Sequence, residues 1–211
     1  MFTGIVTDVG QLLDIEDRND GRRLHIGTRY DPATIDMGAS ITVDGICLTV
    51  TDKGTDATGH WFDVFAALET LEVTEVGKWS KLRRVNLERS LKIGDELGGH
   101  IVSGHIDGVG TIVGREATAE QVTLTFEVKP EIARFIAKKG SVALNGTSLT
   151  VNDVSGNRFS VHLIPYTMQV TSWGDYQLGD HVNVEVDTMA RYAARLIETA
   201  GSWAAPAAAT T

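Results

Sequence analysis

The sequence predicts an all-β protein made of two tandem six-stranded Greek-key barrels, related by internal duplication and followed by a C-terminal α-helix. Two observations carry this prediction: the chain repeats itself over a domain-sized length, and each copy reads as short strands separated by turns. The 22 glycines and only 4 prolines among 211 residues are typical of strands joined by tight turns. A third observation, a single amphipathic segment after the second copy, predicts the helix.

The repeat is visible in several segments that keep their order. Residues 40–52 (SITVDGICLTVTD) align with residues 141–153 (SVALNGTSLTVND) at an offset of 141 − 40 = 101. Residues 62–77 (FDVFAALETLEVTEVG) align without gaps with residues 159–174 (FSVHLIPYTMQVTSWG) at an offset of 159 − 62 = 97. A repeat of about a hundred residues is the size of a domain and too long for a solenoid unit. Chance similarity between two β-rich segments is the less favoured explanation.

Alternating or β-branched runs predict strands in both halves at residues 40–51, 61–66, 85–89, 109–114, 122–128, 141–151, 159–164 and 181–186. Gly45 and Gly146 interrupt the longest runs and predict a hairpin turn or a bulge there. Six strands in a flat sheet would leave exposed edges, so each half is expected to close into a barrel. The predicted domains are residues 1–97 and 98–187.

Two helices are predicted. Residues 130–138 have a proline at their start and Gly140 just past their end. Residues 187–200 place Met189, Tyr192 and Leu196 at helical spacing after Asp187, a capping-type residue. This helix, residues 188–200, must pack either on its own chain or on other subunits. The alanine-rich tail, residues 201–211, is predicted to be flexible.

Composition and the cysteine count argue against several classes of protein. A net charge of −9 disfavours a nucleic-acid partner, which requires a basic surface. The single cysteine allows neither an intrachain disulfide nor a cysteine-based metal cluster. The N-terminus lacks the pattern of a signal peptide, and no apolar run approaches the roughly 20 residues needed to cross a bilayer. A soluble cytoplasmic protein with no membrane partner is therefore expected.

The ordered segments MFTGIV, GASITVDGICLTV, VNLERS, GGHIVSGHIDGVG, HLIPYT and VNVEVD resemble riboflavin synthase along residues 1–197. The resemblance implies dismutation of two molecules of 6,7-dimethyl-8-ribityllumazine into riboflavin and 5-amino-6-(D-ribitylamino)uracil, by transfer of a four-carbon unit. It also implies that no cofactor or metal is needed. The family is typically a homotrimer held by its C-terminal helices, with sites between the first barrel of one subunit and the second barrel of a neighbour. Which barrel holds the donor molecule stays open.

Four residues are the candidates for catalysis. Cys47 aligns with Ser148 in the repeat, and His105 aligns with Ile5, so the two otherwise matched pockets differ in chemistry at these places. The resemblance implies that Cys47, Ser148 and His105 line the active site and that Ser40 lies near the reacting centre. A lone cysteine on a strand is otherwise most often a small buried hydrophobe.

Two further histidines each have two alternative roles. His100 either takes part in the site or bonds backbone carbonyls between the barrels, and the side chain of His162 is either a ligand contact or structural. His100 and His105 are five residues apart, which is not a helix-face zinc pattern, so no metal site is predicted.

The resemblance further implies a set of substrate-binding residues drawn from both halves. The set comprises Phe2, Gly4, Ile5, Val6, Cys47, Leu48, Thr49, Phe65, Ala66, Ala67, Leu68, Glu69, Thr70, Gly104, His105, Ile106, Lys139, Ser148, Leu149, Thr150, His162, Leu163, Ile164, Pro165, Tyr166 and Thr167. Two departures from the family pattern concern this set: the first half has no proline in the stretch ALET, and Tyr166 stands where an acidic residue is common.

Two other functions remain as alternatives. A non-catalytic antenna protein would bind a lumazine or flavin without turnover, and the combination of Cys47, Ser40 and His105 favours the enzyme. A reductase that binds FAD on a six-stranded barrel would need an attached nicotinamide domain with a glycine-rich fingerprint, which the sequence lacks.

Overall fold

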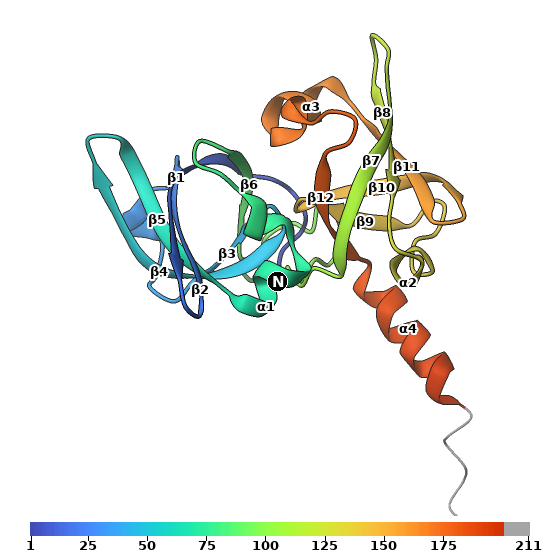
Figure 1. The fold of residues 1–211 in the computed structure, drawn as a ribbon, viewed down its shortest axis with the longest axis horizontal. Coiled ribbons are helices and arrows are strands. Elements are labelled where there is room, and N and C mark those ends of the chain that lie inside the picture. Colours follow the sequence, from blue (N-terminus) through green and yellow to red (C-terminus); the bar gives the residue numbers. More distant parts are fainter. Residues whose placement is uncertain (201–211) are drawn as a thin grey trace, which may run out of the picture.

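A computed structural model describes residues 1–200 and contains two closed six-stranded barrels, as predicted. Figure 1 shows them as separate units joined at a narrow junction. The strands of the first barrel run in the order β1-β2-β5-β4-β3-β6 and those of the second in the order β10-β11-β8-β7-β12-β9. The first barrel contains β1 (Asp8–Arg18), β2 (Gly21–Thr28), β3 (Ser40–Val43), β4 (Ile46–Asp56), β5 (Gly59–Ala67) and β6 (Arg84–Arg89). The second contains β7 (Gly108–Ala117), β8 (Val122–Glu127), β9 (Ser141–Leu144), β10 (Thr147–Ser155), β11 (Arg158–Leu163) and β12 (His181–Val186).

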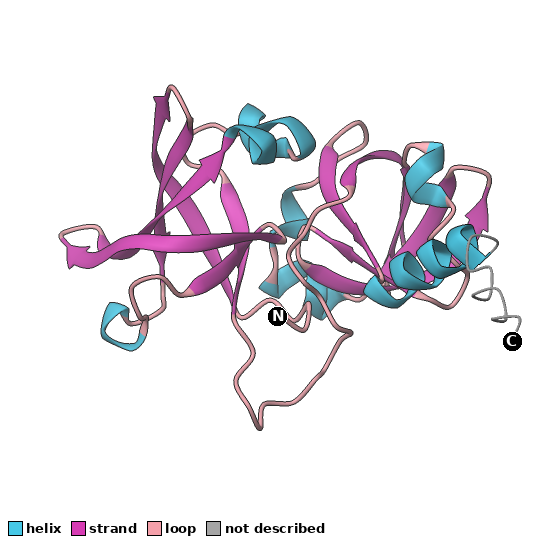
Figure 2. Cartoon of the chain, turned by 90° about the horizontal axis from the view of Figure 1, so that it is seen from below, coloured by secondary structure: helices cyan, strands magenta, loops and turns pink. Residues whose placement is uncertain are grey.

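Short helices lie at the rims of both barrels (Figure 2). They are η1 (Pro32–Thr34), α1 (Leu68–Val73), η2 (Glu75–Lys78), α2 (Pro130–Ala133), α3 (Pro165–Val170) and η3 (Ser172–Asp175), followed by the C-terminal helix α4 (Thr188–Thr199). Helices α1 and α3 occupy equivalent places in the two halves, and the sequence did not indicate them. At six residues each, they are too short to show a helical period.

The predicted helix over residues 130–138 is wrong in length. Only Pro130–Ala133 is helical. The chain then turns so that Ile136 enters the barrel core and the Lys139 N–H donates to the Val151 carbonyl at 2.8 Å. Tertiary packing therefore overrides the local signals of the proline and Gly140.

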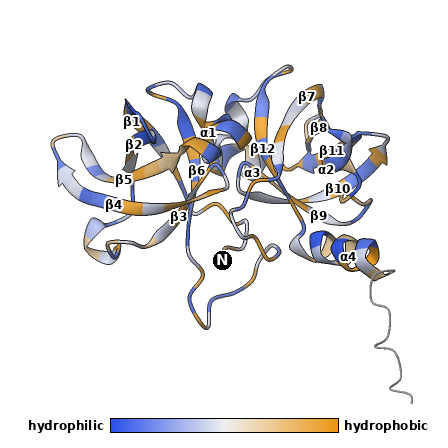
Figure 3. Cartoon of the chain, turned by 60° about the horizontal axis from the view of Figure 1, so that its bottom comes forward, coloured by the Kyte–Doolittle hydropathy of each residue, from blue (hydrophilic) through white to orange (hydrophobic). Residues whose placement is uncertain are grey.

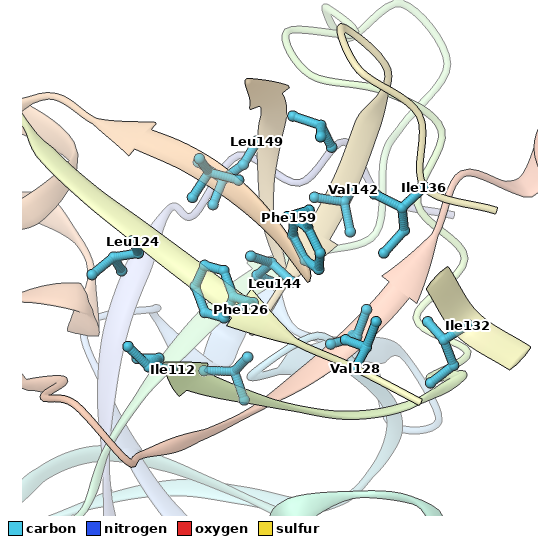
Figure 4. Close-up of a cluster of buried hydrophobic side chains, with 14 of the residues drawn as sticks. Ile112, Leu124, Phe126, Val128, Ile132, Ile136, Val142, Leu144, Leu149 and Phe159 are labelled. Carbon is cyan, nitrogen blue, oxygen red and sulfur yellow. The ribbon is translucent and has the colours of Figure 1, made fainter. Parts of the chain in front are cut away.

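Each barrel has its own apolar core, formed by the inward-facing residues of its strands. Figure 4 shows the core of the second barrel, where Phe126 and Phe159 stack with ring centroids 5.4 Å apart. Trp173 of η3 also belongs to this core and lies edge-on to Phe126, with ring centroids 6.0 Å apart. This large aromatic side chain anchors η3 at the rim of the second barrel.

The hairpin prediction at the two glycines is confirmed. Asp44 and Gly45 form the turn between β3 and β4, and Asn145 and Gly146 form the turn between β9 and β10, all four at positive φ. The two turns meet tip to tip: a Cβ on Gly45 would lie 2.6 Å from the Gly146 nitrogen. Glycine is required at this contact, because any side chain would push the barrels apart.

A buried pair of asparagines joins the barrels with the symmetry of the repeat. Asn86 on β6 donates from Nδ2 to the Asn145 carbonyl at 3.0 Å and accepts from the Ser172 N–H at 2.7 Å. Asn183 on β12 mirrors it, donating to the Asp44 carbonyl and accepting from the Glu75 N–H, both at 2.9 Å. Because both asparagines are at most 1% exposed, these four hydrogen bonds lock one barrel to the turn and rim helix of the other.

The predicted C-terminal helix is present as α4, with Asp187 as its N-cap: the Asp187 carboxylate accepts from the Met189 N–H at 2.9 Å. None of its twelve residues is buried; Figure 1 shows it projecting beyond the second barrel, and Figure 3 shows it beside β9. The predicted tail, residues 201–211, lies outside the described residues. Among residues 1–200, no helix is long and apolar enough to cross a membrane.

Candidate active site

Two pockets occupy equivalent positions in the two halves. The first, termed the Ser148 pocket, has a volume of about 510 Å³. Its lining residues come from the N-terminal segment, from the residue after β2, from β10, and from α3 and the residue after it: Gly4, Ile5, Val6, Thr7, Arg29, Thr147, Ser148, Leu149, Tyr166, Thr167, Val170 and Thr171.

The second, termed the Cys47 pocket, has a volume of about 240 Å³. It is lined by the matching residues of the other half, which come from the segment between the barrels, from β4 and from α1: Ile46, Cys47, Glu69, Thr70, Val73, Thr74, Gly104, His105 and Ile106. A wider groove of about 650 Å³ continues from it along Val73 and Thr74. The duplication of the sequence has therefore produced two related pockets in one chain.

Each pocket combines both halves of the chain, because the segments that precede the barrels cross over. Phe2 pairs with Val102 in an antiparallel bridge. Beyond this bridge the Gly4 carbonyl accepts from the Ser148 N–H at 2.8 Å in the second barrel. The Gly104 carbonyl likewise accepts from the Cys47 N–H at 2.9 Å in the first barrel.

The close approach of these segments depends on glycine at both crossings. Gly4 and Gly104 have φ of +75° and +80°. A Cβ on either would lie 2.5 Å from the Cβ of Ser148 or Cys47, respectively. Neither the conformation nor the space admits another residue without a shift of the segment.

Two glutamates fix the crossing segments to their own barrels. The Glu88 carboxylate accepts from the Thr3 N–H, the Thr3 hydroxyl and the Gly4 N–H, at 2.7, 2.7 and 2.9 Å. Glu185 holds Ser103 and Gly104 in the same way, at 2.6 to 2.8 Å. Burial raises the pKa of the Glu88 carboxyl, and the three hydrogen bonds act in the opposite direction. A buried carboxylate thus fixes the segment that forms one side of each pocket.

An imidazole and a hydroxyl meet at the Ser148 pocket. Nδ1 of His100 and Oγ of Ser148 lie 2.7 Å apart, and Nε2 of His100 is buried without a hydrogen-bond partner in the structure. Burial lowers the pKa of His100, which keeps the ring neutral at neutral pH. A neutral imidazole next to a hydroxyl is suited to proton exchange with a bound molecule.

The imidazole at the Cys47 pocket belongs to His105. His105 is exposed and lines this pocket together with the half-buried Cys47. Ile5, which occupies the equivalent position in the Ser148 pocket, is 45% exposed. His100 is not among the residues that line the Ser148 pocket and contacts it only through Ser148, whereas His105 lines the Cys47 pocket directly. The two pockets therefore differ in where an imidazole lies relative to them.

The structure brings 13 of the candidate residues into the two pockets: Gly4, Ile5, Val6, Ser148, Leu149, Tyr166 and Thr167 in one, and Cys47, Glu69, Thr70, Gly104, His105 and Ile106 in the other. The remaining candidates lie outside the lining of both pockets. They are Phe2, Ser40, Leu48, Thr49, Phe65, Ala66, Ala67, Leu68, Lys139, Thr150, His162, Leu163, Ile164 and Pro165.

Four of these outlying residues turn their side chains away from solvent. Leu48, Ala66 and Leu163 are at most 5% exposed and belong to the barrel cores. Phe2 is 1% exposed and packs against Val102 and Ala143 between the barrels, so within one chain it does not present a ring face to a ligand. Only the backbone of these residues is available for contacts.

Several lining residues were not among the sequence candidates. Thr74 and Thr171 border equivalent pockets, and each hydroxyl donates to a carbonyl four residues earlier, at Thr70 and Thr167. Thr74 and Thr171 align with each other in the repeat, and this match could have identified them as pocket residues from the sequence. Arg29 gave no such signal, because it reaches the Ser148 pocket from the opposite barrel.

Comparisons with known proteins agree with this geometry. The chain matches the family model described as the lumazine binding domain twice, over residues 3–90 and 103–187. It is 51% identical to riboflavin synthase of Brucella abortus (strain 2308), over 94% of this chain and 98% of that protein. It is 39% identical to riboflavin synthase of Mycobacterium tuberculosis (strain ATCC 25618 / H37Rv), over 95% of this chain and 100% of that protein.

Among solved structures, LumP complexed with 6,7-dimethyl-8-(1'-D-ribityl) lumazine has a TM-score of 0.76 at 21% identity, covering 88% of this chain and 99% of that chain. This likeness supports the fold. Two matched barrels, each with its own pocket, define a protein of the duplicated lumazine-binding class. The chain belongs to the riboflavin synthase family.

Proposed function

We propose that this protein is a transferase that converts two molecules of 6,7-dimethyl-8-ribityllumazine into riboflavin and 5-amino-6-(D-ribitylamino)uracil. One molecule gives up a four-carbon unit, which the other gains, so the two products together contain all the atoms of the two substrates. The observation that carries the proposal is the presence of two equivalent pockets in one chain. A reaction between two identical molecules needs two similar binding sites.

Positioning is expected to supply most of the rate enhancement. Two molecules held in fixed pockets react as if the step were unimolecular, which lowers the entropic part of the barrier. The 7-methyl protons of the substrate are unusually acidic, so a modest base is sufficient to start the reaction. Proton-exchanging groups are available at both pockets: His105 lines the Cys47 pocket, and Ser148, which lines the other pocket, lies 2.7 Å from Nδ1 of His100.

The two reacting molecules are proposed to meet between subunits of a homotrimer. Helix α4 exposes Met189, Tyr192, Leu196 and Ile197 at 67% to 77%, an apolar face that is suited to packing against α4 of other copies. The Cys47 pocket of one subunit would then face the Ser148 pocket of a neighbour. The reducing cytoplasm is the proposed compartment, in keeping with the single free thiol.

The direct test is incubation of the purified protein with 6,7-dimethyl-8-ribityllumazine in the absence of any added cofactor, with a chelator present. Riboflavin and the pyrimidinedione are expected to appear in equal amounts, one of each for every two lumazines consumed. Lumazine that binds but is recovered unchanged would reject the proposal and favour an antenna protein.

Replacing Cys47 by serine is expected to lower turnover about tenfold while lumazine binding is retained, because a hydroxyl is a much weaker acid and nucleophile than a thiol. The variant gives the first pocket the hydroxyl that Ser148 gives the second. Turnover is measured by riboflavin formation and binding by fluorescence titration. An unchanged rate would remove Cys47 from the mechanism.

A further inference from the structure

Helix α4 makes a polar contact with the segment that carries His105. We infer that Arg191 on this helix is a positioning residue, which fixes the backbone of His105 at the Cys47 pocket. The inference rests on the proposed function, because it assigns Arg191 a role in the same reaction.

The contact is made by the guanidinium of Arg191. Its Nη2 donates to Oδ2 of Asp107 at 2.8 Å and to the backbone carbonyl of His105 at 3.3 Å. The Arg191 side chain is only 33% exposed and the Asp107 side chain 21%, so solvent screens this ion pair less than a fully exposed one. One guanidinium therefore reaches both ends of a three-residue stretch, His105 to Asp107.

Asp107 ties this stretch to the barrel as well. Its Oδ2 also accepts from the Val186 N–H at 2.8 Å, and its own N–H donates to the Val184 carbonyl at 2.9 Å. The carboxylate thus connects the end of β12, the start of α4 and the His105 segment. A change in the position of α4 would be transmitted to His105 through two hydrogen bonds.

The first half of the chain holds its equivalent segment differently. Thr7 occupies the place of Asp107, at an offset of 107 − 7 = 100. The Thr7 hydroxyl bonds the Tyr30 hydroxyl at 2.5 Å, so this end of the Ile5 segment is held by a residue of the first barrel. The contact with α4 is thus found on the segment that bears the histidine, which is where the two pockets differ in chemistry.

This arrangement links assembly to catalysis. Helix α4 turns Arg191 toward the barrel, whereas Met189, Tyr192 and Leu196 remain exposed for packing against other copies. Packing of this apolar face would hold the helix in place, and Arg191 would in turn hold His105. An unanchored helix would leave the imidazole free to leave the Cys47 pocket.

The test compares Arg191→Ala, Arg191→Lys and Asp107→Asn with the control Arg195→Ala. Arg195 lies one turn further along α4 and pairs with Glu198 of the same helix at 3.8 Å. Loss of positioning is expected to lower kcat roughly tenfold in Arg191→Ala and in Asp107→Asn with little change in KM. Arg191→Lys is expected to restore most of kcat, and Arg195→Ala to leave it unchanged. The acid side of the pH profile of kcat should shift in the two impaired variants.

A readout that does not depend on turnover separates this inference from the proposed function. The imidazole and backbone amide resonances of His105 are recorded by NMR in the wild-type protein and in Arg191→Ala, where their chemical shifts are expected to change. They are expected to stay the same in Arg195→Ala. Wild-type kcat and unchanged His105 chemical shifts in both Arg191→Ala and Asp107→Asn would overturn the inference. A wild-type protein that forms no riboflavin would refute the proposed function, while the His105 chemical shifts would still report on Arg191.

Discussion

Replacing Gly104 by alanine is expected to reduce the formation of riboflavin by about 100-fold, because a displacement of about 1 Å at a reacting group has effects of this size. The new Cβ would lie 2.5 Å from Cys47 Cβ and 2.9 Å from Cys47 N, both of which belong to a rigid strand. The segment that contains Gly104 must therefore move. This movement breaks the hydrogen bond between the Cys47 N–H and the Gly104 carbonyl and displaces His105. The measurement is the steady-state rate with 6,7-dimethyl-8-ribityllumazine.

Gly38→Ala is the matched control for this substitution. Gly38 has the same φ, +80°, but a Cβ there would meet nothing within 4 Å. Both variants thus carry the cost of a left-handed alanine, about 1 to 2 kcal/mol, and only Gly104→Ala also disturbs a pocket. Equal activity of the two variants would show that the close approach at Cys47 has no part in catalysis.

Replacing Asn183 by alanine is expected to lower the free energy of unfolding by about 3 kcal/mol, because each buried group left without a partner costs about 1 to 3 kcal/mol. The substitution leaves the Asp44 carbonyl and the Glu75 N–H unpaired at the junction between the barrels. Urea unfolding, followed by tryptophan fluorescence, measures the difference. The pockets should weaken as well, since each is built from both barrels.

Two further variants accompany this prediction. Asn86→Ala removes the mirrored pair of hydrogen bonds and should cost a similar amount. Asn19→Ala, in the exposed turn between β1 and β2, should change stability by no more than about 0.5 kcal/mol. A loss in Asn183→Ala no larger than that of Asn19→Ala would mean that the asparagine pair does not join the barrels.

Features that depend on neighbouring residues could be predicted from the sequence. Asp44-Gly45 and Asn145-Gly146 indicate their hairpins because positive φ at two successive positions favours these residue types. Asp187 indicates the start of α4 for a similarly local reason, as its side chain caps the next turn. The duplication extended these local predictions to two complete barrels.

Features that depend on distant partners could not be predicted. The pairing of Phe2 with Val102 brings Gly4 to the second barrel, and nothing near either residue indicates the other. The role of His100 depends on Ser148, which lies 48 residues further along the chain. The sequence shows an asparagine at equivalent places of both halves, Asn86 and Asn183. It does not show that each of them bonds a residue of the opposite barrel. Tertiary contacts, and not propensity, decide these positions.

We propose that each of the two pockets holds one substrate molecule and that the two pockets of a working site belong to different chains. Gly4→Ala impairs the Ser148 pocket and Gly104→Ala the Cys47 pocket, so the two variants leave complementary pockets intact. The measurement is riboflavin synthesis by each variant alone and by the two variants coexpressed in one cell.

Each variant alone is expected to be nearly inactive. Random assembly of the two in a ring joins two intact pockets at about one quarter of the sites, so the coexpressed protein should recover about a quarter of the wild-type rate. Full activity of either variant alone, or no recovery on coexpression, would contradict the account.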